Sequence, residues 1–86
     1  MKRFYKVASH ERREDGSFGI LLDGRPVRTP ARAFLALPHA ALAEAVAQEW
    51  AAQGEDIDPA SMPFTGFANA ALDQIASRAK HLHHVA

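Results

Sequence analysis

Three histidines near the end of the chain come closest to the residue types and spacing of a metal site. His81 and His84 are three positions apart, so on a helix both could reach one ion, with His83 beside them. Zinc requires further ligands, and the chain has no cysteine and no HExxH pattern to supply them. We therefore predict a surface role without metal, and any other role of His81, His83 and His84 stays open.

Acidic and hydroxyl side chains form no recognisable catalytic group. The carboxylates of Glu55, Asp56 and Asp58 are ligands that Mg²⁺ or Ca²⁺ would accept, but a polar stretch before Pro59 is typical of a solvated loop. No serine stands with a base and an orienting group, and no glycine-rich loop precedes a helix, as phosphate binding would require. We predict no catalytic residue, no cofactor and no metal, and we expect that the protein is not an enzyme.

Basic and aromatic residues around one predicted hairpin suggest a surface for single-stranded nucleic acid: Arg25, Arg28 and Arg32 with Tyr5, Phe18 and Phe34. The formal net charge of zero argues against this function, because nucleic-acid binding depends largely on neutralising phosphates. The aromatic residues alternate into the expected core, and no RNA-binding signature is present. A small nucleic-acid-binding module that uses this hairpin is therefore the alternative function.

The element that carries these arginines is a hairpin centred on Asp23-Gly24. Asp and Gly tolerate the positive φ angles of a two-residue type I′ turn, and apolar runs flank the pair on both sides. Such a turn fixes the register of the two strands. The predicted opposite pairs are Leu22–Arg25, Ile20–Val27 and Phe18–Thr29.

One side of this hairpin is suited to a core and the other is charged. Side chains alternate along a strand, which places four apolar residues on the same side: Phe18, Ile20, Leu22 and Val27. Pro26 and Pro30 lose no hydrogen bond to the facing strand, so their outer side is predicted to be a sheet edge. Arg25 and Arg28 remain as candidates for contact with a partner.

Further short strands complete an antiparallel meander. Residues 3–9 are rich in aromatic and β-branched side chains and are predicted to form the first strand. The polar run 10–16 is predicted to be an exposed loop. After a turn at residues 29–32, the apolar run 34–37 is predicted to be the last strand.

At Pro38 the apolar spacing changes to that of a helix. Leu42, Val46 and Trp50 recur every four residues, which predicts an amphipathic helix with Pro38 in its first turn. Gly54 is the expected left-handed terminator. The helical spacing places Trp50 in the core, and an interface with a partner is the alternative for this residue.

A second amphipathic helix is predicted after a connector, with Thr65 as its cap. Its apolar stripe consists of Ala68, Ala71, Leu72, Ile75, Ala79 and Leu82. Asn69 and Asp73 are predicted to face water or a partner. No Gly or Pro ends the helix before Ala86, so we expect a truncated helix. Residues 1–86 alone are then expected to be marginally stable or to self-associate through the face of Ala68, Leu72 and Ile75.

The predicted fold class is α+β, with an antiparallel β meander over residues 2–37 and two amphipathic helices over residues 38–86. Together they are expected to form one N-terminal domain of a longer architecture. The 86 residues are 48% hydrophobic and 23% charged, which fits a globular chain. Residues 1–32 hold eight Lys/Arg and four Asp/Glu, giving +4, and residues 33–86 hold two and six, giving −4. We expect the two halves to neutralise each other within one fold.

The order of several motifs resembles the start of the ATP12 family. The similarity begins at residues 2–6, includes the hairpin at 21–30, and continues through 35–38, 41–47 and 49–55 of the first helical region. It extends through Ile57-Asp58-Pro59 and Met62-Pro63 into Thr65, Asn69 and Asp73 of the second helix. Gly66-Phe67 departs from this pattern, which has a basic residue followed by Leu.

This resemblance implies a non-enzymatic chaperone for assembly of the F1 part of ATP synthase. Its partner would be the free F1 α subunit, whose β-facing surface it would shield until the α/β hexamer forms. Family members carry a helical C-terminal domain with a functional acidic residue, which has no counterpart in these 86 residues. We expect a cytoplasmic protein of bacterial type, or a mitochondrial matrix protein if the source is eukaryotic. The candidates for partner contact are Arg25, Arg28, Trp50, Asn69 and Asp73.

Overall fold

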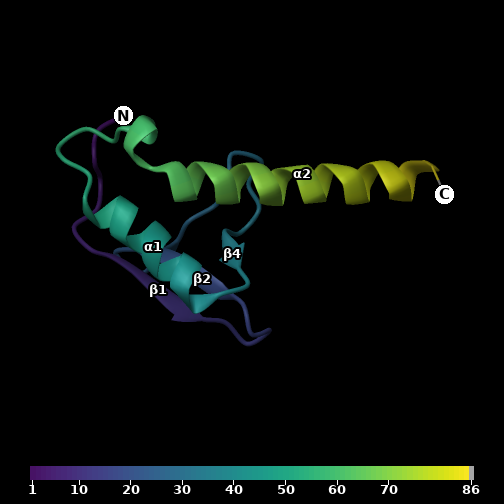
Figure 1. Cartoon of the computed structure of the whole chain (residues 1–86), viewed down its shortest axis with the longest axis horizontal. Helices are drawn as coiled ribbons and strands as arrows, with labels where there is room; N and C mark the ends of the chain where they lie inside the picture. The colour runs from purple at the N-terminus through teal and green to yellow at the C-terminus, as the bar shows by residue number, and fades with distance from the viewer. Residues whose placement is uncertain (86) are drawn as a thin grey trace.

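Four short strands form an antiparallel sheet, and two helices follow them in the chain (Figure 1). The computed structural model describes the backbone of residues 1–85 and the side chains of residues 1–74. The elements are β1 (Ala8–Arg12), β2 (Phe18–Leu22), β3 (Arg25–Pro26), β4 (Ala36–Leu37), α1 (Ala40–Ala51), a 3-10 turn η1 (Pro59–Ser61) and α2 (Pro63–Val85). This arrangement confirms the predicted α+β class.

Strand β2 is the centre of the sheet and pairs with each of the other three strands. At the predicted turn Leu22 lies opposite Arg25, and the backbone N–H of Val27 donates to the Ile20 carbonyl at 2.9 Å. Asp23 and Gly24 have φ angles of 51° and 81°. These positive angles are those of a type I′ turn, so the predicted hairpin and its first two pairs are confirmed.

The predicted Phe18–Thr29 pair is wrong, because Phe18 lies opposite Leu37 of β4. The chain leaves β2 after Val27 and closes a turn on itself. In that turn the Thr29 N–H donates to the Ala33 carbonyl at 2.7 Å, and the Thr29 hydroxyl accepts from the Ala33 N–H at 3.1 Å. Thr29 is therefore unavailable to β2, and β4 completes the ladder instead.

The first strand is shifted toward the C-terminus relative to the predicted residues 3–9. Strand β1 starts at Ala8, which lies opposite Leu22, the last residue of β2. Residues before Ala8 therefore have no part of β2 to pair with. The predicted exposed loop at 10–16 was wrong in its first half, because β1 continues to Arg12 and only the remainder forms a tight turn.

Helix α1 begins at Ala40, after the cap residue His39, and ends at Ala51. The predicted place of Pro38 in its first turn is wrong, because Pro38 precedes the cap residue. The predicted terminator is wrong: the left-handed glycines are Gly16 and Gly24, not Gly54. The helix closes with ordinary right-handed geometry at Ala52, whose N–H donates to the Gln48 carbonyl at 2.9 Å. A left-handed residue is not needed there, because the last carbonyls already have donors.

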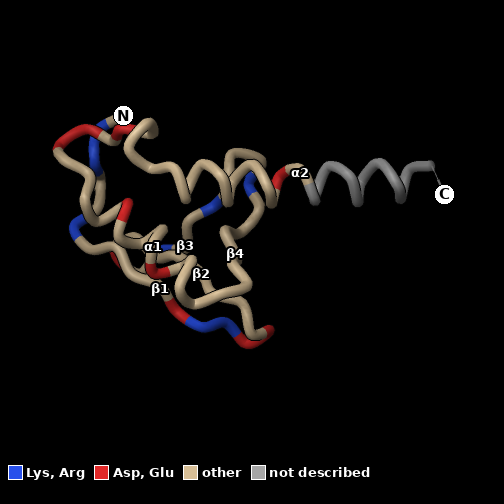
Figure 2. The backbone as a smooth tube through the Cα atoms, in the orientation of Figure 1, with Lys and Arg blue, Asp and Glu red and all other residues tan. Residues whose placement is uncertain are grey.

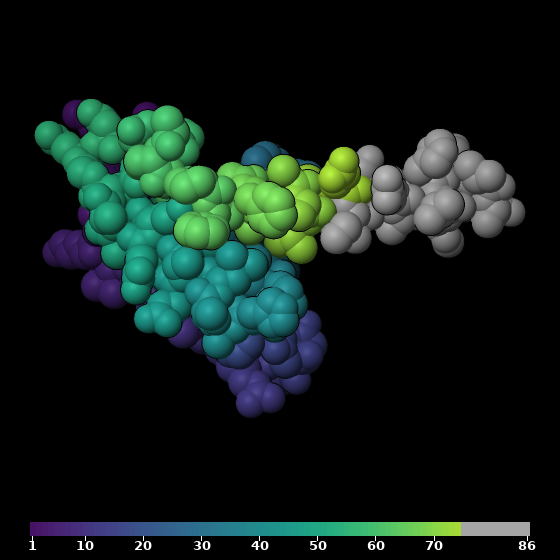
Figure 3. Space-filling view, in the orientation of Figure 1, coloured from purple at the N-terminus to yellow at the C-terminus, as the bar shows by residue number. Residues whose placement is uncertain are grey.

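Helix α2 begins at Pro63, and its N-terminus is capped from α1 and not by Thr65. The Glu49 carboxylate accepts the backbone N–H groups of Phe64 and Thr65 at 2.9 and 2.7 Å, and the Thr65 hydroxyl at 2.7 Å. A carboxylate at this position also interacts favourably with the helix dipole. In the space-filling view the first turns of α2 lie directly against α1 (Figure 3).

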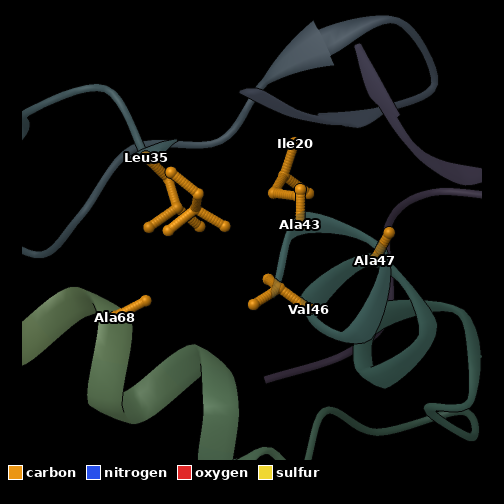
Figure 4. Packing of buried hydrophobic residues seen from close by; sticks show 7 residues of the cluster. Ile20, Leu35, Ala43, Val46, Ala47 and Ala68 are labelled. Carbon is orange, nitrogen blue, oxygen red and sulfur yellow. The ribbon is translucent and has the colours of Figure 1, made fainter. Parts of the chain in front are cut away.

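The main core forms where the sheet, α1 and α2 meet (Figure 4). Its largest fully buried side chains are Ile20, Leu35 and Val46. Ala68 of α2 is only 3% exposed, and Leu72 packs against the same cluster. Two residues of the face that was expected to self-associate are therefore used inside the molecule, and the side chain of Ile75 lies outside the described residues.

Candidate functional site

A hollow of about 360 Å³ lies between the Asp23-Gly24 hairpin and the end of α1. We call it the hairpin groove, and it is lined by Met1, Phe4, Leu22, Arg25, Pro26, Val27, Arg28 and Trp50. Three of the five predicted contact residues therefore meet at one site: Arg25, Arg28 and Trp50. The other two, Asn69 and Asp73, lie on α2 and are not among the lining residues.

Phe4 is the most informative residue of the groove, because it is exposed although its neighbours are firmly held. Its side chain is 67% exposed. The guanidinium of Arg3 donates to four backbone carbonyls, those of Tyr5, Lys6, Ala51 and Gln53, at 2.6–3.2 Å. Phe4 is therefore presented to solvent on an anchored backbone.

The backbone around Phe4 is also tied to the connector before η1. The Arg3 N–H donates to the Glu55 carbonyl at 2.8 Å, and the Ile57 N–H donates to the Met1 carbonyl at 2.7 Å. Lys2 forms a β-bridge with Asp56, so a basic residue of the first half lies beside an acidic residue of the second (Figure 2). The bridge is a backbone pairing, so the expected neutralisation of the two halves stays a prediction.

Three aromatic residues link the groove to the interior. The rings of Phe4 and Tyr5 are 5.4 Å apart and those of Tyr5 and Trp50 are 5.7 Å apart, both edge to face. The Tyr5 hydroxyl donates to the Trp50 carbonyl, and burial raises the pKa of Tyr5. Trp50 packs against the main core and against a second buried cluster, which consists of Tyr5, Leu22, Ile57 and Met62. Its predicted place in the core is therefore confirmed, and the residue also lines the groove.

Arg25 and Arg28 supply the positive charge of the groove in different ways. Arg25 is exposed at the start of β3. The Arg28 guanidinium is held 4.4 Å from the centre of the Phe34 ring, and it donates to the Arg32 carbonyl at 3.3 Å. The Arg13 guanidinium lies 4.8 Å from the same ring.

These contacts do not favour the nucleic-acid alternative. Two guanidinium groups already lie against Phe34, and Phe18 packs against the main core. Single-stranded nucleic acid needs aromatic faces on which bases can stack. The aromatic residues predicted for this surface are therefore buried in the case of Tyr5, packed on the core in the case of Phe18, and already in contact with guanidinium groups in the case of Phe34.

Asp73 connects α2 to the turn at residues 29–33. One carboxylate oxygen of Asp73 accepts the Ala31 N–H at 3.3 Å. The other oxygen of Asp73 and the amide oxygen of Asn69 are buried and have no hydrogen-bond partner among the described residues. Both side chains are half-buried, so neither faces water alone.

The acidic stretch 55–58 has a local structural role. The Asp58 carboxylate accepts the Ala60 N–H at 3.2 Å and so caps η1. Within the part of the chain that the structure describes, no three His, Cys, Asp or Glu side chains are grouped to hold a metal ion. The predicted histidine pair, His81 and His84, and its neighbour His83 lie outside the described side chains.

Comparison with known proteins decides the family. The profile of the family described as ATP12 chaperone protein matches residues 2–86. The chain belongs to the ATP12 chaperone family. A crystal structure of Atp12 from Paracoccus denitrificans is 40% identical with a TM-score of 0.83, and the match covers 98% of this chain and 36% of that one.

A second similar crystal structure is that of the Atu1473 protein from Agrobacterium tumefaciens, described as "a putative chaperone". It is 46% identical with a TM-score of 0.84, and the match covers 93% of this chain and 30% of that chain. This chain therefore spans about a third of the length of these ATP12-type structures. No described helix is both long and apolar enough to span a membrane.

Sequence reasoning missed Phe4 as part of the ATP12 chain's candidate site. Residues 3–9 were predicted to be a strand, and a strand with Tyr5 and Val7 on one face leaves Phe4 on the other. This alternation was the sequence signal that Phe4 faces away from the core. The anchoring of the segment by Arg3 and Asp23 involves contacts distant in sequence, which spacing alone does not reveal.

Proposed function

We propose that this protein assists assembly of the F1 part of ATP synthase by binding the free α subunit. It shields the surface of α that later pairs with β, and it is released when the α/β hexamer forms. The observation that carries the proposal is membership of the ATP12 chaperone family over residues 2–86, supported by the likeness to Atp12 at 40% identity. The proposed location is the bacterial cytoplasm, or the mitochondrial matrix in a eukaryote.

The exposed apolar side chains agree with a chaperone. Phe4, Phe64 and Phe67 are 67%, 52% and 71% exposed. Large aromatic residues are enriched where proteins bind other proteins, and an exposed apolar patch on α would otherwise favour aggregation. A surface that offers aromatic contact can cover such a patch without any catalytic chemistry.

Aggregation of α subunit tests this function directly. Purified α subunit is warmed with and without an equal amount of the full-length protein, and light scattering is followed. We expect scattering to be suppressed, and we expect addition of β subunit to transfer α into α/β complexes. Unchanged scattering of α, or suppression equal to that of an unrelated protein of the same size, would contradict the proposal.

A further inference from the structure

We propose that the hairpin groove binds a short client segment in which a large apolar side chain stands next to acidic residues. The identity of the client rests on the proposed chaperone function, whereas the chemistry of the bound segment is inferred from the groove itself. The groove joins an apolar lining to two arginines, and each of these features selects one property of the segment.

The apolar part of the groove is formed before any partner arrives. Arg3 anchors the backbone on one side of Phe4, and the Asp23 carboxylate accepts the N–H groups of Lys6 and Val7 at 2.9–3.1 Å on the other. A side chain on an anchored backbone loses less conformational entropy on binding. Phe4 and Trp50 therefore offer a preorganised contact for one apolar side chain.

The positive charge of the groove favours a client segment that carries acidic residues next to its apolar side chain. Its lining includes Arg25 and Arg28 and no acidic residue. Asp23 lines the adjoining hollow, where its carboxylate accepts the backbone N–H groups of Lys6 and Val7 and also interacts with the nearby charge of Arg25. The Arg28 guanidinium is held against Phe34, which is outside the groove, whereas Arg25 is exposed at the groove and is the arginine placed to capture a carboxylate.

The groove is suited to a side chain and not to an added strand. Pro26 is in the edge strand β3 and has no N–H to offer on the outer side of the sheet, which disfavours pairing with an incoming strand. The volume of about 360 Å³ lies at the lower end of the range for ligand clefts. One large apolar side chain with adjacent carboxylates fits these limits.

Peptide binding tests the groove independently of the α subunit. The probe is a fluorescein-labelled 12-residue peptide with a central Phe-Leu flanked by glutamates, and its matched version carries lysines in their place. Binding to the full-length protein is measured by fluorescence anisotropy at low and high salt. We expect the acidic peptide to bind at least about tenfold tighter than the basic one, and salt to weaken its binding.

Paired variants locate the binding on the groove. Phe4→Ala and Arg25→Glu should each weaken binding of the acidic peptide about tenfold. Val7→Ala and Arg12→Glu are the controls, because they remove an exposed apolar side chain and an exposed arginine outside the groove, and they should change Kd less than twofold. Circular dichroism verifies that all four variants are folded.

The outcomes separate this inference from the proposed function. Equal binding of the two peptides, no binding of either, or equal effects of groove and control variants would overturn the inference. If the acidic peptide binds at the groove but free α subunit is not bound, the groove is supported and the proposed function fails. If α is bound equally by the wild type and by Phe4→Ala and Arg25→Glu, the function is supported and the inference fails.

Discussion

Glu49 determines how the two helices meet. The first N–H groups of a helix have no partner within that helix, and a buried group without a partner destabilises the fold. Glu49 supplies its carboxylate from the last turns of α1 to the N–H groups of Phe64 and Thr65. One residue thus fixes the start of α2 at a point that the local sequence does not mark.

We expect Glu49→Ala to lower the free energy of unfolding by about 2 kcal/mol, because three hydrogen bonds to a carboxylate are lost. Glu49→Gln keeps an acceptor and should lower it by about half as much. The exposed Glu44 on the same helix provides the control, and Glu44→Ala should change stability by less than about 0.5 kcal/mol. Urea unfolding measures all three. Equal stability of Glu49→Ala and Glu44→Ala would contradict this role.

Asp23 has two functions at the residue scale, since it forms the turn and also anchors the N-terminal segment. Hydrogen bonds from the Val7 and Lys6 N–H groups lower the pKa of its carboxyl group below the ordinary value. A lowered pKa in the folded state means that ionised Asp23 stabilises the fold. This contribution is complete above about pH 4 and is lost as the pH falls through the lowered pKa of the folded state.

Replacement of Asp23 by Asn should therefore destabilise the protein more at pH 6 than at pH 3. The difference in melting temperature between the wild type and Asp23→Asn, measured at both pH values, checks this sign. Amide hydrogen exchange gives the location: Lys6 and Val7 should lose protection. Asp15→Asn, which alters the turn at the other end of β2, should leave these two amides unchanged. A larger difference at pH 3 would refute the assignment.

At the scale of elements, the sequence predicted correctly those turns and helices whose formation depends on neighbouring residues. The Asp23-Gly24 turn requires only positive φ at two neighbouring residues, and the turn was predicted correctly. The apolar spacing in α1 likewise placed Val46 and Trp50 toward the interior. The pairing of Phe18 with Leu37 could not be predicted, because it depends on how residues 29–33 turn back on themselves.

For the candidate site too, the sequence indicated individual residues but not the distant contacts that bring them together. Arg25, Arg28 and Trp50 were chosen from the sequence, but their meeting in one groove depends on packing of the hairpin against the end of α1. Phe4 was placed in a strand because propensity favoured it. The observed strand starts later, since β2 offers no residue beyond Leu22 for pairing.

Leu35 belongs to the main core where β2, α1 and α2 meet, so replacing it tests how these elements pack together. Leu35 is 1% exposed, and its side chain points toward those of Val46 and Ala68 (Figure 4). Leu35→Ala should lower the free energy of unfolding by about 2–5 kcal/mol, through lost apolar burial and a residual cavity. Val7→Ala removes an apolar side chain that is 61% exposed and should have little effect. Urea unfolding that gives equal values for both variants would contradict the assigned core.

At the scale of the whole molecule, a small core supports an unusually well-anchored N-terminal segment. The side chains of Arg3 and Asp23 together form seven hydrogen-bond contacts, which hold the segment that contains the exposed Phe4. Anchoring an exposed aromatic residue has a clear physical use if that residue contacts another protein. The fold therefore combines an anchored N-terminal segment with an exposed apolar side chain, as the proposed client contact requires.

The most direct test of the proposed function is sedimentation of the full-length protein mixed with purified F1 α subunit. We predict one faster-sedimenting species that contains both proteins, and we predict that this species disappears when β subunit is added. Each protein is present at about 10 μM, so that even a complex with a micromolar Kd, which corresponds to a binding free energy of roughly −8 kcal/mol, would be largely formed. Two independent boundaries at the positions of the separate proteins would contradict the account.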